Sequence, residues 1–138
     1  MTKGQISSGP SAPIRVLLVE DTPIDAELVL RQLKRHGFTF QSKRVSTESE
    51  FLQALMGFDP DVILSDYSMP RFSGLRALEL TRQLAADIPF IFVSGSVRPQ
   101  DATTAFKDGA VDFVTKDDLM RLGPAIQNAL VGSRNLKS

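Results

Sequence analysis

The chain has 138 residues, and its 16 Lys and Arg residues balance its 16 Asp and Glu residues. That length suits one globular domain, and a neutral chain lacks the surplus cations of a sequence-independent nucleic-acid binder. The absence of cysteine excludes disulfides and cysteine-based zinc sites, and the single histidine excludes a multi-histidine metal site. No apolar run approaches the ~18 residues of a membrane span. Because the polar first residues also lack a signal core, we expect a cytoplasmic protein.

The first half of the chain alternates between strand-like and helix-like segments. Residues 1–13 are rich in Gly, Ser and Pro, which predicts a flexible leader. Ile14–Val19 is short, apolar and β-branched, as is typical of a strand buried on both faces. Thr22–Gly37 has a capping residue, an early proline and a terminal glycine, and these predict a helix. Phe38–Val45 is a more polar strand, expected nearer the sheet edge, and a capping-box pattern predicts a helix over 47–57.

The second half repeats the alternation, with apolar runs for strands and apolar residues at helical spacing for helices. The predicted strands are Val62–Leu64, Ile88–Val93 and Val111–Val114. The helices that follow them are predicted at Leu75–Leu84, Ala102–Phe106 and Leu119–Leu130. Short connections of this kind form parallel sheets with right-handed crossovers. The predicted fold is therefore α/β, a five-stranded parallel sheet with helices on both faces in a (βα)5 flavodoxin-like arrangement. We expect it to span 14–131, with a tail over 132–138.

Polar side chains follow four of the predicted strands directly. Glu20 and Asp21 follow the first strand, Asp66 the third, Ser94 the fourth, and Lys116 lies just after the fifth. Parallel strands deliver such residues to one edge of the sheet. Clustered carboxylates suit Mg2+, a carboxylate can act as a nucleophile toward phosphorus, and a lysine and a hydroxyl can bind phosphoryl oxygens. Each residue alone has a simpler explanation as a helix cap or a solvated charge. The prediction of a site for Mg2+ and phosphoryl chemistry therefore depends on their occurring together at the ends of the strands.

The motifs around these residues resemble those of a response regulator receiver domain, the chemotaxis-type receiver fold of two-component signalling. The spacings of 45 residues from Asp21 to Asp66, 28 to Ser94 and 22 to Lys116 fit that family. The similarity extends from about Ile14 to Leu130. The motifs that carry it are Val19-Glu20-Asp21, Leu64-Ser65-Asp66-Tyr67-Ser68-Met69-Pro70 with Gly74-Leu75, Val93-Ser94-Gly95, and Gly109 through Lys116.

The resemblance implies a Mg2+-dependent phosphorelay reaction. Asp66 would accept a phosphoryl group, and Lys116 would hold that group. Asp21, Asp66 and the backbone carbonyl of Ser68 would ligate Mg2+, while Glu20 would act directly or through water. The domain would catalyse only its own phosphorylation and dephosphorylation, and so it is not expected to be a turnover enzyme.

The resemblance also implies a conformational switch and protein partners. Ser94 would turn toward the phosphoryl group, and Phe113 lies where the family keeps a rotating aromatic residue, although Phe113 also fits a simple core position. The donor would be a sensor histidine kinase, a histidine phosphotransfer protein or a small acyl phosphate. The recipient of the signal would be a downstream protein or a fused output domain. A separate hypothesis comes from helix spacing: Ile24 and Leu28 lie four residues apart and opposite the core stripe, so exposed together they would dock on the helix bundle of a kinase or phosphotransfer protein.

Two departures from the family pattern carry expectations. Asp117 replaces the proline that usually follows the lysine, and a non-proline cis bond costs ~2.5–4 kcal/mol, so we expect a trans peptide. Ser68 and Ser96 stand where the family tunes phosphoryl lifetime. Neither carries an acid or an amide to orient an attacking water, so we expect an aspartyl-phosphate of intermediate to long lifetime.

Three other functions compete with the receiver. A phosphatase of the haloacid-dehalogenase type also uses a strand-end aspartate and Mg2+, but it needs a second aspartate where Ser68 stands. A flavodoxin-like nucleotide or flavin module needs a phosphate-binding loop, whereas Asp21-Thr22-Pro23 is acidic. A degenerate receiver would signal without phosphate. The sequence is compatible with a stand-alone receiver and with a segment of a longer regulator or hybrid kinase.

Overall fold

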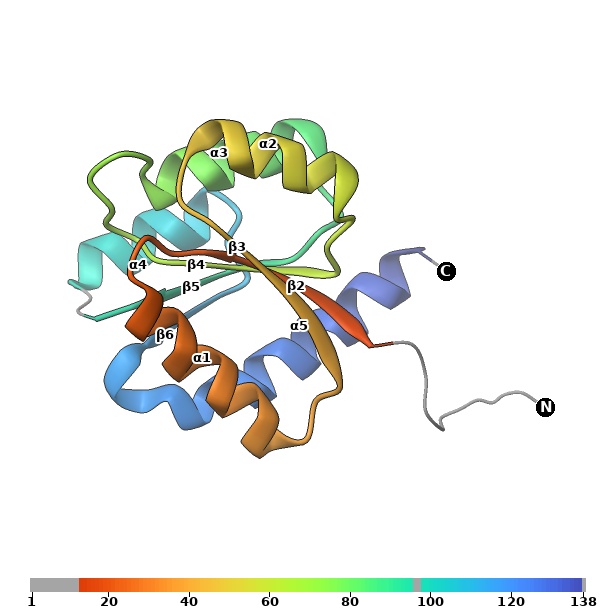
Figure 1. The fold of residues 1–138 in the computed structure, drawn as a ribbon. Helices are drawn as coiled ribbons and strands as arrows, with labels where there is room; N and C mark the ends of the chain where they lie inside the picture. The colour runs from red at the N-terminus through yellow and green to blue at the C-terminus, as the bar shows by residue number, and fades with distance from the viewer. Residues whose placement is uncertain (1–12, 96–97, 138) are drawn as a thin grey trace.

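The computed structural model describes residues 13–95 and 98–137. They form one sheet of five parallel strands between two layers of helices (Figure 1), which confirms the predicted fold class. The strand order is β3-β2-β4-β5-β6, with the polar strand β3 at one edge as predicted. The strands are β2 (Ile14–Val19), β3 (Phe40–Val45), β4 (Val62–Ser65), β5 (Phe90–Ser94) and β6 (Asp112–Thr115). The predicted leader (except Pro13) and Ser96 lie outside the described residues.

Helices cover both faces of the sheet. They are α1 (Pro23–His36), α2 (Glu48–Gly57), α3 (Gly74–Leu84), α4 (Pro99–Lys107) and α5 (Leu122–Lys137). The first and last share one face, and the other three cover the opposite face (Figure 1). Alternate residues of β2 serve the two layers: Val16 and Leu18 pack in the α1–α5 core, and Leu17 and Val19 in the α2–α4 core. This two-sided burial explains why β2, β4 and β5 are mostly apolar, whereas the edge strand β3 is polar.

Local capping fixes where the helices begin. The Thr47 hydroxyl accepts a hydrogen bond from the Glu50 amide at 3.2 Å, and the Glu50 carboxylate accepts one from the Ser46 amide at 2.9 Å. This confirms the predicted capping box. Thr22 stands at the start of α1 as expected, but its side chain makes no capping bond and instead reaches Asp21 at 3.4 Å. Gly37 ends α1 at φ 100°, a left-handed conformation that favours glycine.

The last helix differs from its prediction at both ends. Lys116–Arg121 form a 3-10 helix, η1, with a non-helical break at Asp118, and α5 begins at Leu122 rather than Leu119. Pro124 explains the later start, because its missing N–H is tolerated only in the first turn of a helix. At the other end α5 runs past Leu130 to Lys137, so the predicted tail over 132–138 begins inside the helix. The described chain has no cis peptide bond, and the Lys116–Asp117 bond is trans as predicted.

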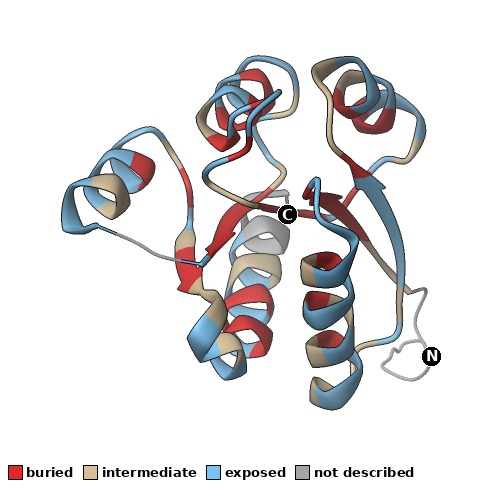
Figure 2. Cartoon of the chain, turned by 60° about the vertical axis from the view of Figure 1, so that its left-hand side comes forward, coloured by how far each residue is buried: buried red, intermediate tan, exposed pale blue. Residues whose placement is uncertain are grey.

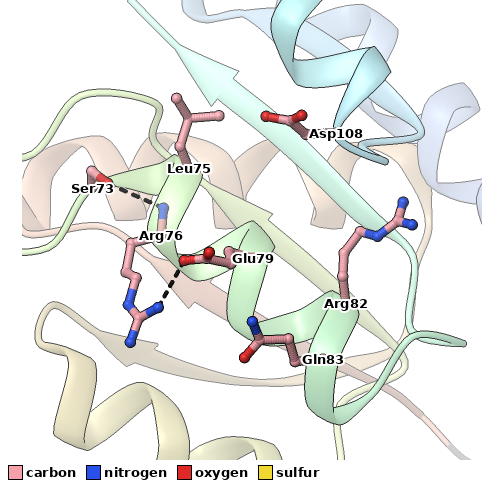
Figure 3. A pocket seen from close by; sticks show the side chains of 7 residues that line it. All are labelled: Ser73, Leu75, Arg76, Glu79, Arg82, Gln83 and Asp108. Carbon is pink, nitrogen blue, oxygen red and sulfur yellow. Dashed lines mark hydrogen bonds and ion pairs between the residues drawn. The ribbon is translucent and has the colours of Figure 1, made fainter.

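The outer surfaces of the helices are mostly exposed, and their inner faces are buried (Figure 2). A groove of about 590 Å³ lies beside α3 (Figure 3). Two of its lining residues, Arg76 and Glu79, form an ion pair at 2.7 Å, and Arg76 also contacts Glu48 at 3.0 Å. Among the described residues, no helix combines the length and apolar composition needed to cross a membrane.

Candidate functional site

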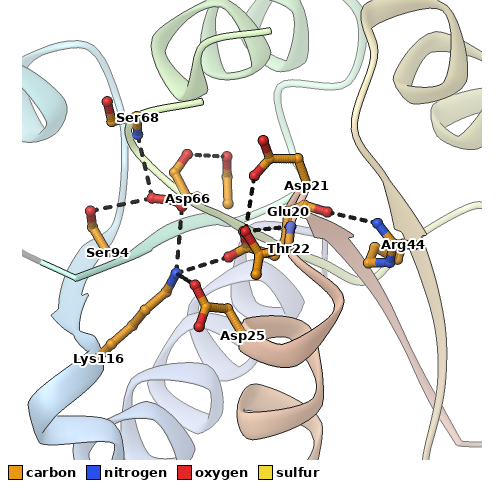
Figure 4. A network of polar contacts seen from close by, with 10 residues as sticks. Glu20, Asp21, Thr22, Asp25, Arg44, Asp66, Ser68, Ser94 and Lys116 are labelled. Carbon is orange, nitrogen blue, oxygen red and sulfur yellow. Dashed lines mark hydrogen bonds and ion pairs between the residues drawn. The ribbon is translucent and has the colours of Figure 1, made fainter. Parts of the chain in front are cut away.

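The predicted site residues meet at the carboxyl ends of the strands (Figure 4). β3 lies on one side of β2 and β4 on the other, so the chain reverses direction across the sheet at β2. Open α/β sheets bind ligands at such a switch point. The sheet hydrogen bonds continue into the site, because the amide of Asp66 donates to the Val19 carbonyl at 2.9 Å and that of Glu20 to the Val45 carbonyl at 3.0 Å. Both acidic residues therefore stand on a rigid backbone.

The Asp66 carboxylate lies at the centre of the contacts. One oxygen accepts hydrogen bonds from the Ser94 hydroxyl at 3.3 Å and the Ser68 amide at 3.4 Å. The other faces the Lys116 ammonium at 3.4 Å. The Asp66 side chain is 14% exposed, so it is sheltered but reachable. The structure thus brings together the three residues for which the sequence predicted phosphoryl chemistry.

Three carboxylates could hold a metal ion. Glu20, Asp21 and Asp66 each offer an oxygen, and these oxygens lie within 4.8 Å of one another. Burial raises the pKa of Glu20 despite opposing hydrogen bonds from Lys116 and the Thr22 amide. Three crowded carboxylates, with Glu20 buried, Asp66 half-buried and Asp21 exposed, fit a hard divalent cation such as Mg2+, which takes oxygen ligands and keeps several waters. The carbonyl of Ser68 as a further ligand stays a prediction.

Lys116 has a partner that the sequence did not predict. Its ammonium contacts Glu20 and Asp25 at 2.9 Å each, closer than it approaches Asp66. Burial alone would lower the pKa of Lys116, but its bonds to Asp25 and Glu20 outweigh burial and raise the pKa. Asp25 lies in the first turn of α1, where an acidic residue is common because it interacts favourably with the positive end of the helix dipole. The sequence feature that could have indicated this contact is the position of Asp25 only four residues after Asp21, close to the predicted site.

Phe113 belongs to an aromatic cluster beneath the site. Its ring lies 5.4 Å from that of Phe92 and 5.6 Å from that of Tyr67, and Phe113 is buried. The Tyr67 hydroxyl reaches Asp101 of α4 at 3.5 Å, and burial followed by the nearby Asp101 charge raises the Tyr67 pKa. The buried position of Phe113 fits both predictions for it, a core residue and the inward position of a switch. The sequence did not predict the link from Tyr67 to α4.

Ile24 and Leu28 lie exposed on the outer face of α1. Their exposed fractions are 71% and 45%, whereas Ala26, Val29 and Leu33 of the same helix are buried. The exposure is as predicted from their spacing. Their role in docking a partner stays a prediction.

The fold and the site together define an α/β protein that presents a cluster of carboxylates around a lysine at a topological switch point. The chain matches the response regulator receiver domain family over residues 16–127 and belongs to that family. It therefore has the role of a phosphoacceptor receiver in two-component signalling. The comparisons give no support to the phosphatase alternative.

Individual relatives agree with this assignment. The chain is 32% identical to the cell cycle transcriptional regulator CtrA of Caulobacter vibrioides over 103 residues, which are 75% of this chain and 44% of that protein. It is 30% identical to the sensor histidine kinase RcsC of Escherichia coli over 73% of this chain and 10% of that protein. Among solved structures, the receiver domain of a LuxO repressor protein from Vibrio parahaemolyticus superposes with a TM-score of 0.78 at 26% identity, covering 91% of this chain and 96% of that one. The chain thus spans less than half the length of these two curated relatives.

Proposed function

We propose that Asp66 is the phosphoacceptor of this receiver. The observation that supports it most strongly is the convergence of Lys116, Ser94 and the carboxylates of Glu20 and Asp21 on the Asp66 side chain. An Asp66 oxygen bonds to phosphorus while the bond from phosphorus to a histidine nitrogen, or to the acyl oxygen of a small donor, breaks. The electron pair of that bond leaves with the nitrogen or the oxygen.

The surrounding residues stabilise the phosphoryl charge and bind the metal ion. Lys116 stabilises the charge on the transferring phosphoryl oxygens from a sheltered position. Glu20, Asp21, Asp66 and the Ser68 carbonyl would hold Mg2+, which when bound would offset the negative charge of the acidic residues and the phosphoryl group.

The switch is part of the same proposal. The Ser94 hydroxyl, which now donates to Asp66, turns to the phosphoryl oxygens once they are present. Phe113 responds by repacking against Phe92 and Tyr67, because it has no hydroxyl of its own. The phosphorylated state is thereby signalled through packing.

We also propose the partners. The donor is a sensor histidine kinase or a histidine phosphotransfer protein, and the recipient is a downstream protein or a fused output domain. Two relatives fit this pattern, since one is a transcriptional regulator and the other a sensor histidine kinase. The receiver unit comprises residues 14–131 and acts in the cytoplasm without direct contact to nucleic acid.

The test of the proposed function is covalent labelling. The protein is incubated with acetyl phosphate and Mg2+ and its intact mass is measured. We expect an increase of one phosphoryl group that disappears when EDTA replaces Mg2+. An unchanged mass under both conditions would rule out the proposal.

The phosphoryl group is expected to persist for an intermediate to long time. Ser68, two residues after Asp66, is exposed and carries no acid or amide that would orient an attacking water. The measurement is the decay of the labelled mass after donor removal. Ser68→Asn supplies the missing amide and is expected to shorten the lifetime. A wild-type half-life of a few seconds would contradict the prediction.

Charging the exposed pair on α1 is expected to weaken kinase docking. Ile24→Asp or Leu28→Asp should slow phosphotransfer from the cognate kinase about tenfold, as the loss of about 1.4 kcal/mol of binding energy would. Labelling by acetyl phosphate should stay at the wild-type rate. Met56→Asp is the matched control, because Met56 is 87% exposed but lies on α2 across the sheet. Equal transfer to all variants would refute docking at α1.

A further inference from the structure

The ammonium of Lys116 is shared among three carboxylates. A lysine ammonium has three N–H donors, and Glu20, Asp25 and Asp66 each accept one. The contacts to Glu20 and Asp25 are 2.9 Å long, whereas the one to Asp66 is 3.4 Å. Asp66, the proposed nucleophile, thus makes the longest of the three contacts with the lysine (Figure 4).

Asp25 approaches the lysine from a different layer than the other acids. It belongs to the first turn of α1, and Glu20 and Asp66 follow strands. That turn is fixed by Pro23, by the hydrogen bond from the Ala26 amide to the Thr22 carbonyl at 3.1 Å, and by the buried side chain of Ala26. The Asp25 carboxylate, with a side chain 34% exposed, is therefore a stationary anchor on the α1 side of the site.

The position of a lysine ammonium depends on its partners, because a flexible four-carbon stem carries it. With Asp25 present, two short ion pairs hold Lys116 beside Asp66 and leave its third donor in a long, replaceable contact. Without Asp25, one short ion pair would remain and the ammonium would move onto Asp66. A tight ion pair there would make Asp66 a weaker nucleophile.

We propose that Asp25 is a positioning residue for phosphoryl transfer. It anchors the Lys116 ammonium together with Glu20, so that the third N–H is free to pass from Asp66 to the phosphoryl group. It acts through Lys116 and does not touch the reacting atoms. This inference rests on the proposed role of Asp66 as phosphoacceptor.

A purely electrostatic role for Asp25 predicts the opposite change in labelling rate from a positioning role, so the direction of the change distinguishes the two. Three carboxylates, those of Glu20, Asp25 and Asp66, contact one ammonium, and the Asp21 carboxylate lies near those of Glu20 and Asp66. If Asp25 contributed only charge, its neutralisation would favour the approach of an anionic donor and speed labelling. A positioning role requires that labelling become slower.

The kinetic arm compares Asp25→Asn, Asp25→Glu and Glu27→Gln as full chains labelled by acetyl phosphate with Mg2+. Asp25→Asn is expected to lower the maximal labelling rate by up to about 10²-fold, the cost that a 1 Å misplacement of a catalytic group can reach, with little change in the half-saturating donor concentration. Asp25→Glu, which restores a carboxylate, should recover part of the lost rate. Glu27→Gln removes one negative charge from the same helix, at a residue that is 62% exposed and paired with Arg31 at 3.0 Å, and it should label like wild type. A wild-type or faster rate for Asp25→Asn would overturn the proposal.

The second arm needs neither donor nor metal. In an anchored lysine the two Hε protons have different NMR shifts, and free rotation averages them. We expect distinct shifts for Lys116 in the wild type and in Glu27→Gln, and a collapse toward one shift in Asp25→Asn. Unchanged, distinct shifts in Asp25→Asn would overturn the anchoring role. A wild type that does not label would instead refute the function of Asp66, and the NMR arm would still decide whether Asp25 anchors Lys116.

Discussion

Lys116→Met is expected to slow labelling by acetyl phosphate about 10²–10³-fold, the usual cost of losing one preorganised group that stabilises transition-state charge. It should also destabilise the metal-free protein by about 3 kcal/mol at neutral pH, because it leaves a buried carboxylate without its cation. Glu20 carries most of this cost, since its side chain is only 4% exposed. Labelling rates and urea unfolding in EDTA measure the two effects.

The loss of stability should depend on pH in a defined direction. Burial already raises the folded-state pKa of Glu20 above its ordinary value, so the folded state holds this proton more tightly than the unfolded state. Ionised Glu20 therefore costs stability as the pH rises through its folded pKa, and removing Lys116 raises that pKa further. The difference between wild type and variant should be small in acid and reach its full size at neutral pH.

The matched control for this experiment is Lys107→Met, which removes an exposed lysine from the end of α4. It is expected to leave both labelling and stability near the wild-type values, as surface substitutions usually do. A Lys116→Met variant as stable as the wild type at neutral pH, or one whose deficit does not change with pH, would contradict the buried ion pair.

Gly74→Ala is expected to destabilise the fold by about 3 kcal/mol, the upper end of the usual cost of overpacking. A Cβ at this position would collide with the backbone carbonyl oxygen of Asp66 and lie 2.7 Å from the Phe92 ring and 3.0 Å from the Tyr67 Cα. Backbone atoms cannot yield as a flexible side chain does. Because the colliding oxygen belongs to Asp66 itself, labelling should slow as well.

Gly57→Ala is the matched control. A Cβ on Gly57, the last residue of α2, would meet no atom within 4 Å apart from its chain neighbours and the backbone of its own helix. We expect it to be neutral or to stabilise by up to about 1 kcal/mol, since alanine favours the helix and restricts the unfolded chain. The free energies of unfolding of both variants are measured in urea. Equal stabilities for Gly74→Ala and Gly57→Ala would show that the α3 start does not press against Asp66.

The sequence was sufficient to predict the sheet and the central site residues, because both depend on local pattern. Buried parallel strands are apolar throughout, so the residue that follows each strand is easy to locate. Asp66 and Ser94 lie at the same edge for that reason. The sequence pattern places the start of α5 too early, at Leu119, because the apolar spacing continues through η1, whereas Pro124 requires that the helix begin close before it.

The contacts that the sequence did not predict are tertiary. Asp25 and Lys116 are 91 residues apart, and Tyr67 and Asp101 are 34 apart. Their pairing depends on how closely α1 approaches the end of β6 and α4 approaches β4. Helix periodicity sets the orientation of a side chain but not these distances. Asp25 therefore looked like an ordinary acidic residue in a first helical turn.

The most direct test of the central claim is to locate the phosphoryl group. The wild type, Asp66→Ala and Asp108→Ala are treated with acetyl phosphate and Mg2+, and intact mass and peptide mass are measured. Asp108 is an exposed aspartate at the end of α4, so its removal controls for the loss of a carboxylate. We predict one phosphoryl group on Asp66 in the wild type and in Asp108→Ala, and none in Asp66→Ala. Undiminished labelling of Asp66→Ala would contradict the assignment of Asp66 as phosphoacceptor.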